Sequence, residues 1–203
     1  MKIALIGAQG VGKTTTAKAI SAAFPDSQVV RETVRECPYP CDQNADFKTE
    51  WWVLSHSILA EQEAREMNRK LIITDRCLLD ISVYTKLINQ CGDGRITDIQ
   101  RKLIDNSIEL WLKEDPFDMI FFLKVDPTIW QTRDLNDGFR NLDLSWYEIL
   151  NSEFEDAISR ITLPTHTKVE TILNNGSFDD TLTAIRGKIF RTIEPNLPLE
   201  LRQ

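Results

Sequence analysis

The chain has 203 residues, of which 42% are hydrophobic and 27% are charged, and these values argue against a disordered, collagen-like or disulfide-scaffold protein. Its 24 Lys and Arg residues against 31 Asp and Glu residues give a formal net charge of -7, which disfavours a general nucleic-acid-binding surface because such surfaces are basic. No apolar run approaches the roughly 18 residues that a membrane span needs, and the four cysteines fit free thiols in a reducing compartment. We therefore expect a cytoplasmic protein with neither a membrane nor a nucleic acid as its partner.

Short apolar runs alternate with stretches of helical periodicity along the chain. The strands expected from the apolar runs cover residues 2–6, 28–31, 71–75, 119–125 and 168–173. The helices expected from the periodic stretches cover residues 13–24, 46–69, 78–89, 98–112, 145–161 and 178–190, with a short one around Trp130. This alternation predicts an α/β domain over residues 1–190, with a five-stranded parallel sheet covered by helices on both faces, and a tail over 191–203.

The longest expected helix, over residues 46–69, contains aromatic residues that allow two interpretations. Its apolar positions recur at helical spacing and are Phe47, Trp51, Leu54, Ile58 and Leu59. This spacing favours a core position for Trp51, although its flat ring could also stack on a nucleobase. The charged residues in the second half of the helix are expected to be solvated, and these are Glu61, Glu63, Arg65 and Glu66.

A glycine-rich segment joins the first expected strand to the first expected helix. Residues 7–14 satisfy the pattern G-x4-G-K-[ST], in which backbone N–H groups and the helix N-terminus face a polyphosphate. Lys13 would place its charge between the β- and γ-phosphates, and Thr14 would offer its hydroxyl to Mg²⁺. We therefore expect ATP and Mg²⁺ as cofactors, and the expected nucleotide-binding residues are Gly7, Ala8, Gln9, Gly10, Val11, Gly12, Lys13, Thr14 and Thr15.

Charged residues follow the third expected strand. Asp75 ends that strand, where it could reach Mg²⁺ through water beside the glycine-rich segment or merely cap the next helix. Arg76, Asp80 and Tyr84 follow at intervals of four residues, which is the spacing of one helix face. That face could line an acceptor pocket, or it could hold a surface salt bridge with the tyrosine in the core, and the sequence leaves both open.

Two other segments carry candidate groups at strand ends. Glu32 follows the second expected strand and could act as a general base, or it could pair with Arg35. Arg133 and Arg140 lie in a polar segment after the fourth expected strand, and two arginines on such a segment suit a lid that neutralises a transferring phosphoryl group.

Three short motifs follow the phosphate-loop pattern in a recognisable order. They are E-x-x-R-E at residues 32–36, D-R-x-x-x-D-x-x-x-Y at 75–84 and D-G-x-R at 137–140. With these motifs the chain resembles the AAA-domain family related to NadR-type ribosylnicotinamide kinases, and it is similar to thymidylate kinases and deoxynucleoside kinases. The resemblance implies a three-layer P-loop NTPase fold and a phosphotransferase activity on small molecules.

These observations together predict a kinase that transfers the γ-phosphoryl group of Mg-ATP to a nucleoside or a nucleoside monophosphate. The catalytic candidates are Lys13, Glu32, Asp75, Arg76, Arg133 and Arg140, and the metal-binding candidates are Thr14 and Asp75. The acceptor-binding candidates are Glu32, Arg35, Trp51, Arg76, Asp80 and Tyr84. The alternative is a nucleotide-binding ATPase or switch that acts through a protein partner, and the sequence leaves a homodimer open.

Overall fold

A computed structural model describes residues 1–41, 44–133 and 144–193 of the chain. Its centre is a five-stranded, wholly parallel sheet in the order β2-β3-β1-β4-β5. The strands are β1 (Lys2–Ile6), β2 (Ser27–Val30), β3 (Leu71–Asp75), β4 (Met119–Lys124) and β5 (Lys168–Leu173). The predicted number, order in the chain and direction of the strands are confirmed.

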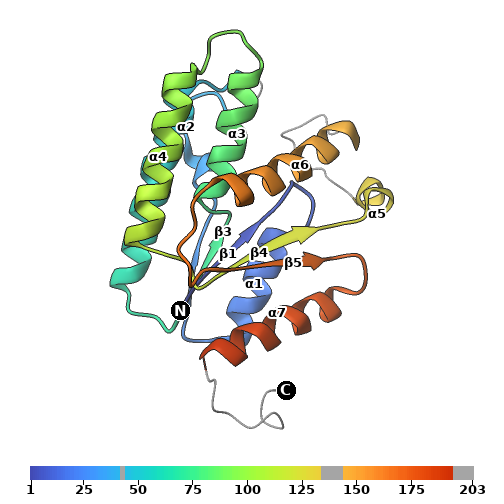
Figure 1. The fold of residues 1–203 in the computed structure, drawn as a ribbon. Coiled ribbons are helices and arrows are strands. Elements are labelled where there is room, and N and C mark those ends of the chain that lie inside the picture. The colour runs from blue at the N-terminus through green and yellow to red at the C-terminus, as the bar shows by residue number, and fades with distance from the viewer. Residues whose placement is uncertain (42–43, 134–143, 194–203) are drawn as a thin grey trace.

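Helices cover both faces of this sheet, which makes three layers (Figure 1). The helices α1 and α7 pack on one face, and α2, α3, α4 and α6 lie on the other. The elements are α1 (Lys13–Ala23), the 3₁₀ helix η1 (Thr33–Glu36), α2 (Phe47–Glu66), α3 (Leu78–Gln90), α4 (Asp98–Glu114), α5 (Pro127–Thr132), α6 (Leu144–Arg160) and α7 (Phe178–Ile193). The chain crosses the sheet in one direction from β1 to β2 and in the opposite direction from β2 onward. Because crossovers between parallel strands are right-handed, this change of direction places α1 on one face and the next helices on the other.

The hydrophobic core lies between the sheet and these helix layers. The strands β1, β3 and β4 are buried along almost their whole length, as expected for parallel strands that are covered on both faces. Beyond the end of β4, Trp130 of α5 stacks on Tyr147 of α6 with ring centroids 4.6 Å apart. Each of these two aromatic side chains also bonds to backbone, Trp130 to the carbonyl of Gln9 and Tyr147 to the amide of Val125. These bonds tie α5 and α6 to the ends of β1 and β4.

The buried face of α2 differs from the prediction. Trp51 is 39% exposed and contacts Phe47, so its predicted core position is wrong. The buried residues of α2 are Thr49, Glu50, Val53, Leu54, Glu61 and Ala64. The sequence pattern misled because helical spacing does not show which side of a helix faces the core, and the buried positions of α2 lie beside Trp51 rather than at it.

Glu61 was predicted to be solvated but is only 1% exposed, because it faces a buried lysine. The Lys2 ammonium donates to Glu61 Oε2 at 2.7 Å and to Asp115 Oδ2 at 2.6 Å. Trp111 of α4 also donates its Nε1–H to Glu61 Oε2. This group joins β1, α2 and α4 at the amino ends of the strands, which is the end of the sheet opposite to the phosphate-loop pattern.

Within the described residues, the structure contains no helix that is both long and apolar enough to cross a membrane. The four cysteines are free thiols.

Candidate functional site

The segment that carries the phosphate-loop pattern turns sharply between β1 and α1. Gly7 has a φ of +133°, and a Cβ atom there would lie 2.3 Å from the Leu123 carbonyl oxygen. Gly12 has a φ of +99°, and a Cβ atom there would lie 2.9 Å from the Asn174 amide nitrogen. Glycine is therefore required at both positions for conformation and for space. The loop ends at Gly12, the N-cap of α1, which makes no side-chain cap. The first-turn N–H groups of α1 therefore favour an anion.

Lys13 lies inside this loop rather than in solvent. Its ammonium donates to the carbonyl oxygens of Gly7 at 2.6 Å and Ala8 at 2.9 Å. Burial and the positive charge of Arg76 lower the pKa of Lys13 from 10.5 to about 8, although nearby carboxylates oppose this shift. A buried cation with a lowered pKa gains strongly from an approaching polyphosphate. The hydroxyl-bearing residues that follow it, Thr14 and Thr15, are exposed.

Two side chains from later elements hold the outer side of the loop. Asn174, at the end of β5, donates to the Val11 carbonyl oxygen at 2.9 Å. Arg133, after α5, donates to the Gly10 carbonyl oxygen at 2.9 Å and to the Asn174 carbonyl oxygen at 2.7 Å. The predicted lid arginine at 133 thus lies against the loop itself, and a phosphate contact would require it to exchange these bonds. Arg140, Asp137 and Gly138 lie outside the described residues.

Asp75 lies beside the phosphate loop, at the carboxyl end of β3. It pairs in register with Leu5 of β1 and is 7% exposed. Its negative charge is among the groups that raise the pKa of Lys13, which places the carboxylate near that ammonium. The exposed hydroxyl of Thr14 and this carboxylate are oxygen ligands of the kind that Mg²⁺ takes, with nucleotide phosphates and waters completing its coordination. The residues present therefore fit a nucleotide-bound Mg²⁺.

Arg76 has an unusual backbone for a residue with a side chain. Its φ is +78°, in the left-handed region that costs such residues about 1 kcal/mol or more. Its amide donates to the Leu5 carbonyl oxygen at 3.0 Å, which continues the pairing of β3 with β1 by one residue. The strained turn directs the chain from β3 into α3 and fixes the start of the Arg76 side chain at the sheet edge.

The Arg76 guanidinium joins the acidic and aromatic candidates in one partly buried group. Its Nε lies 2.6 Å from Glu32 Oε1, and its Nη1 lies 3.4 Å from both Asp80 Oδ1 and Tyr84 Oη. Asp80 is 2% exposed, and burial raises its pKa to about 6 although Arg76 and Lys13 oppose the rise. The predicted Arg76–Asp80 ion pair is present and Tyr84 packs against the core, but the pair is largely withdrawn from water rather than on the surface.

Glu32 and Arg35 form an ion pair, as the alternative to a general-base role for Glu32 predicted. Arg35 Nε lies 3.4 Å from Glu32 Oε2, but the closer partner of Glu32 is Arg76. The Arg35 side chain is mostly exposed, so this pair contributes little to stability. The structure thus brings Glu32, Arg76, Asp80 and Tyr84 together, with Arg35 at their edge.

Sequence reasoning missed Glu50, which lies in the first turn of α2. It is 7% exposed, and burial raises its pKa to about 8 although the positive charge of Arg76 opposes the rise. The only sign of its burial in the sequence is its helical spacing of three and four residues from Val53 and Leu54, which are buried. Glu50 thus adds a fifth group next to the Arg76 cluster.

The sequence profile of an AAA domain family matches residues 2–167. The curated protein sequences gave no significant match. Among solved structures, deoxyadenosine kinase from M. mycoides with bound dCTP superposes with a TM-score of 0.69 at 21% sequence identity, covering 93% of this chain and 98% of that chain. The same enzyme with bound dATP gives 0.67 at 22% identity, with the same coverage. These likenesses show the P-loop NTPase fold that the sequence predicted.

Proposed function

Because the chain belongs to the AAA domain family whose profile matches residues 2–167, we propose that it is a kinase that transfers the γ-phosphoryl group of Mg-ATP to a nucleoside or nucleoside monophosphate. Phosphoryl transfer needs little covalent chemistry from the protein and depends on positioning and charge neutralisation. The described residues offer a group for each of these tasks.

The phosphate loop and its lysine would hold the donor. Backbone N–H groups of the loop and of the first turn of α1 would bind the phosphate oxygens, and Lys13 would leave the Gly7 and Ala8 carbonyls for the β- and γ-phosphates. Thr14 and Asp75 would hold Mg²⁺, which when bound neutralises charge that develops between the phosphates. Arg133, and Arg140 outside the described residues, would neutralise the transferring group.

The Arg76 cluster would hold the acceptor. Arg76 and Tyr84 offer donors for a sugar hydroxyl or a phosphate, and Glu32 offers an acceptor for the proton of the attacking hydroxyl. Because the guanidinium fixes Glu32 and Asp80 at once, the carboxylates would be oriented before the acceptor binds.

One observation carries this proposal: the acceptor cluster begins at the end of β3, the strand that pairs with β1, so its charges lie close to the phosphate-loop lysine. Arg76, Asp80, Asp75 and Glu32 all shift the pKa of Lys13. An acceptor held by the cluster would therefore lie next to the γ-phosphate. A protein that only binds or hydrolyses ATP needs no such group beside its phosphate loop.

The test is ADP formation from Mg-ATP with and without pools of nucleosides and of nucleoside monophosphates. We expect acceptor-dependent ADP in the wild-type protein and none in Lys13→Ala, with folding checked by circular dichroism. Lys18→Ala, an exposed lysine on the same helix, serves as the matched control and should retain the activity. ADP formation that is indifferent to every acceptor would contradict the kinase and favour an ATPase or switch that acts through a protein partner.

A further inference from the structure

The helix α4 carries apolar residues on its outward side as well as on its buried side. The core-facing residues of this helix are Ile104, Ile108 and Leu112. On the outward side, Ile99 is 81% exposed, Leu103 46% and Leu110 63%. The helix lies at an edge of the molecule, beside α2 and α3 (Figure 1). Large apolar side chains that gather on one exposed helix side, rather than being scattered singly, mark an interaction surface.

The outward residues of α4 have the spacing of a seam between two helices. Ile99, Leu103, Asn106, Leu110 and Lys113 follow one another in alternating steps of four and three residues. All five side chains are exposed. This alternation is the repeat of 3.5 residues with which one helix packs along another. The outward side of α4 therefore has the pattern of a helix that packs lengthwise against a second helix.

This seam is complementary to itself when two copies of α4 run antiparallel. A two-fold axis at Asn106 sets Leu103 of one copy against Leu110 of the other, because these residues lie three positions before and four positions after it. Ile99 and Lys113 lie seven positions to either side, so the methylene stem of Lys113 would cover Ile99. The two Asn106 amides would meet on the axis, where each can donate to the other. A polar pair within an apolar seam fixes register and orientation.

The charges beside the seam support the same arrangement. Lys102 lies four residues before Asn106, and Glu109 lies three residues after it. Because seven residues make two helical turns, Lys102 and Glu109 share one flank of the seam. A two-fold axis across antiparallel helices sets this flank against the same flank of the second copy, so each Lys102 would meet a Glu109. Glu109 lies at the edge of the flank, where its Oε1 accepts from the Thr162 amide at 3.0 Å.

We propose that α4 is a homodimer interface, in which its outward seam packs antiparallel against the same seam of a second copy of this chain. Such a dimer does not depend on the proposed function, because the candidate catalytic and binding residues all lie outside α4. A single pair of helices is at the small end of specific interfaces, which bury about 1,200 Å² or more. We therefore expect a dissociation constant in the micromolar range.

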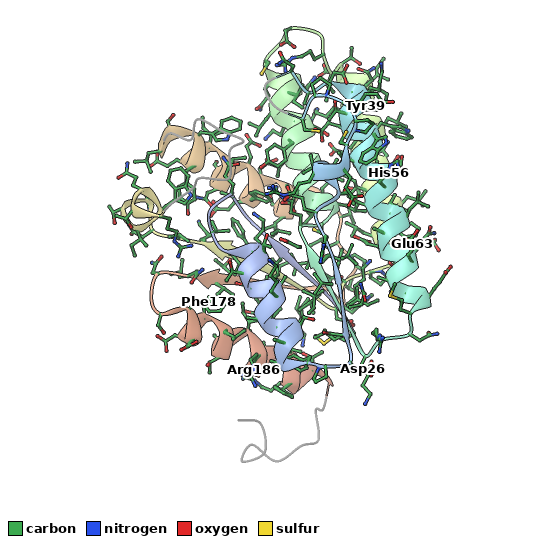
Figure 2. The ribbon with its side chains drawn as sticks, turned by 180° about the vertical axis from the view of Figure 1, so that it is seen from behind. Asp26, Tyr39, His56, Glu63, Phe178 and Arg186 are labelled. Atoms are coloured by element: carbon green, nitrogen blue, oxygen red, sulfur yellow. The ribbon has the colours of Figure 1, made fainter. Side chains whose placement is uncertain are left out.

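Sedimentation velocity of the full chain measures this association between about 1 and 300 µM, the range that a micromolar dissociation constant requires. Leu103→Glu and Leu110→Glu each place a charge inside the apolar seam. The matched control is Leu173→Glu, because Leu173 is 64% exposed at the end of β5. Figure 2 shows α7, with Phe178 and Arg186, which packs beside β5 on the face of the sheet opposite to α4. Circular dichroism checks that each variant folds.

We expect the wild-type protein to form dimers as its concentration rises, and Leu173→Glu to behave in the same way. Leu103→Glu and Leu110→Glu should each raise the dissociation constant at least tenfold. Lys102→Glu alone and Glu109→Lys alone should each raise it about threefold to tenfold, since like charges would then face each other twice in the dimer. The double variant Lys102→Glu/Glu109→Lys restores opposite charges and should return toward the wild-type value.

Two outcomes would overturn the dimer through α4. A wild-type protein that stays monomeric at 300 µM would mean that the seam meets a different protein. Dimers that persist unchanged in both leucine variants would place the interface elsewhere on the molecule. If a leucine variant fails to fold, the charge variants decide, because a double variant no better than the single ones contradicts the antiparallel pairing.

Discussion

Replacing Glu50 by Gln should remove a pH-dependent loss of stability. The pKa of this carboxyl group is about 8 in the folded protein, compared with an ordinary value of 4.5. Between these values the folded protein binds a proton that the unfolded chain has released, so the stability that the neutral acid provides is complete below pH 4.5 and is lost as pH rises through 8. At about 1.4 kcal/mol per pH unit, the loss between pH 4.5 and pH 7 is at most about 3 kcal/mol.

Urea unfolding at pH 5, 6, 7 and 8 measures this loss. Gln is similar in size and cannot ionise, so Glu50→Gln should gain stability relative to the wild type as pH rises, with the largest difference at pH 8. The raised pKa of Asp80 acts in both proteins and therefore cancels from the difference. Glu63→Gln should show no such trend. Parallel stability curves for wild type and Glu50→Gln would mean that the Glu50 carboxyl is ionised in the folded protein, and the argument from its burial would fail.

Three further predictions follow from other parts of the fold. Only the protonated form of Lys13 attracts phosphate, so the Kd for ATP should rise about fivefold between pH 8 and pH 9, and a flat profile by calorimetry would contradict the lowered pKa. Gly12→Ala should lower the free energy of unfolding in urea by about 1–3 kcal/mol more than Gly94→Ala does. Gly94 also has a positive φ, but a Cβ atom there would meet open space, so equal losses would contradict the steric argument. Lys2→Met leaves Glu61 buried without its cation, while Asp115 keeps its ion pair with Arg65, and should cost about 3–5 kcal/mol, whereas the exposed Lys70→Met should cost almost nothing in the same assay.

Much of the fold could be predicted because its signals are local. Each strand is a short, nearly continuous apolar run, and the phosphate-loop pattern joins the first strand to a helix. The N-terminus of α2 is likewise a local event, since the Asp46 carboxylate accepts from the amides of Lys48 and Thr49. The predicted helix began one residue too early because Asp46 is the N-cap itself.

The errors arose where burial depends on a distant partner. Glu61 resembles any solvated helical glutamate, and only the approach of Lys2, 59 residues away, brings it into the interior. Trp51 has the spacing of a core residue, but α3 and α4 pack against the adjacent side of the helix. The candidate site shows the same difference between local and distant signals. Lys13 was predicted from the phosphate-loop motif and Asp75 from its place at the end of a strand. The burial of Glu50 could not be predicted, because it depends on where α3 packs.

The left-handed backbone of Arg76 had no sequence signal, yet it brings this charge to the phosphate loop. Arg76 lowers the pKa of Lys13, whereas Asp80, Asp75 and Glu32 raise it. Removing the guanidinium should therefore raise the pKa of Lys13 from about 8 toward the ordinary 10.5, while it abolishes acceptor-dependent transfer. In Arg76→Ala the affinity for ATP should consequently begin to decline at a higher pH than in the wild type.

Arg76→Lys provides the matched control, because it keeps a positive charge near Lys13 but loses the planar group that contacts Glu32, Asp80 and Tyr84. It should lose most of the acceptor-dependent transfer and keep the wild-type pH profile of ATP binding. If Arg76→Ala and Arg76→Lys both retain the wild-type profile, the cluster and the phosphate loop do not share one electrostatic environment. The acceptor would then have to be placed by other residues, and the assignment of Glu32 and Arg76 to the transfer step would be wrong.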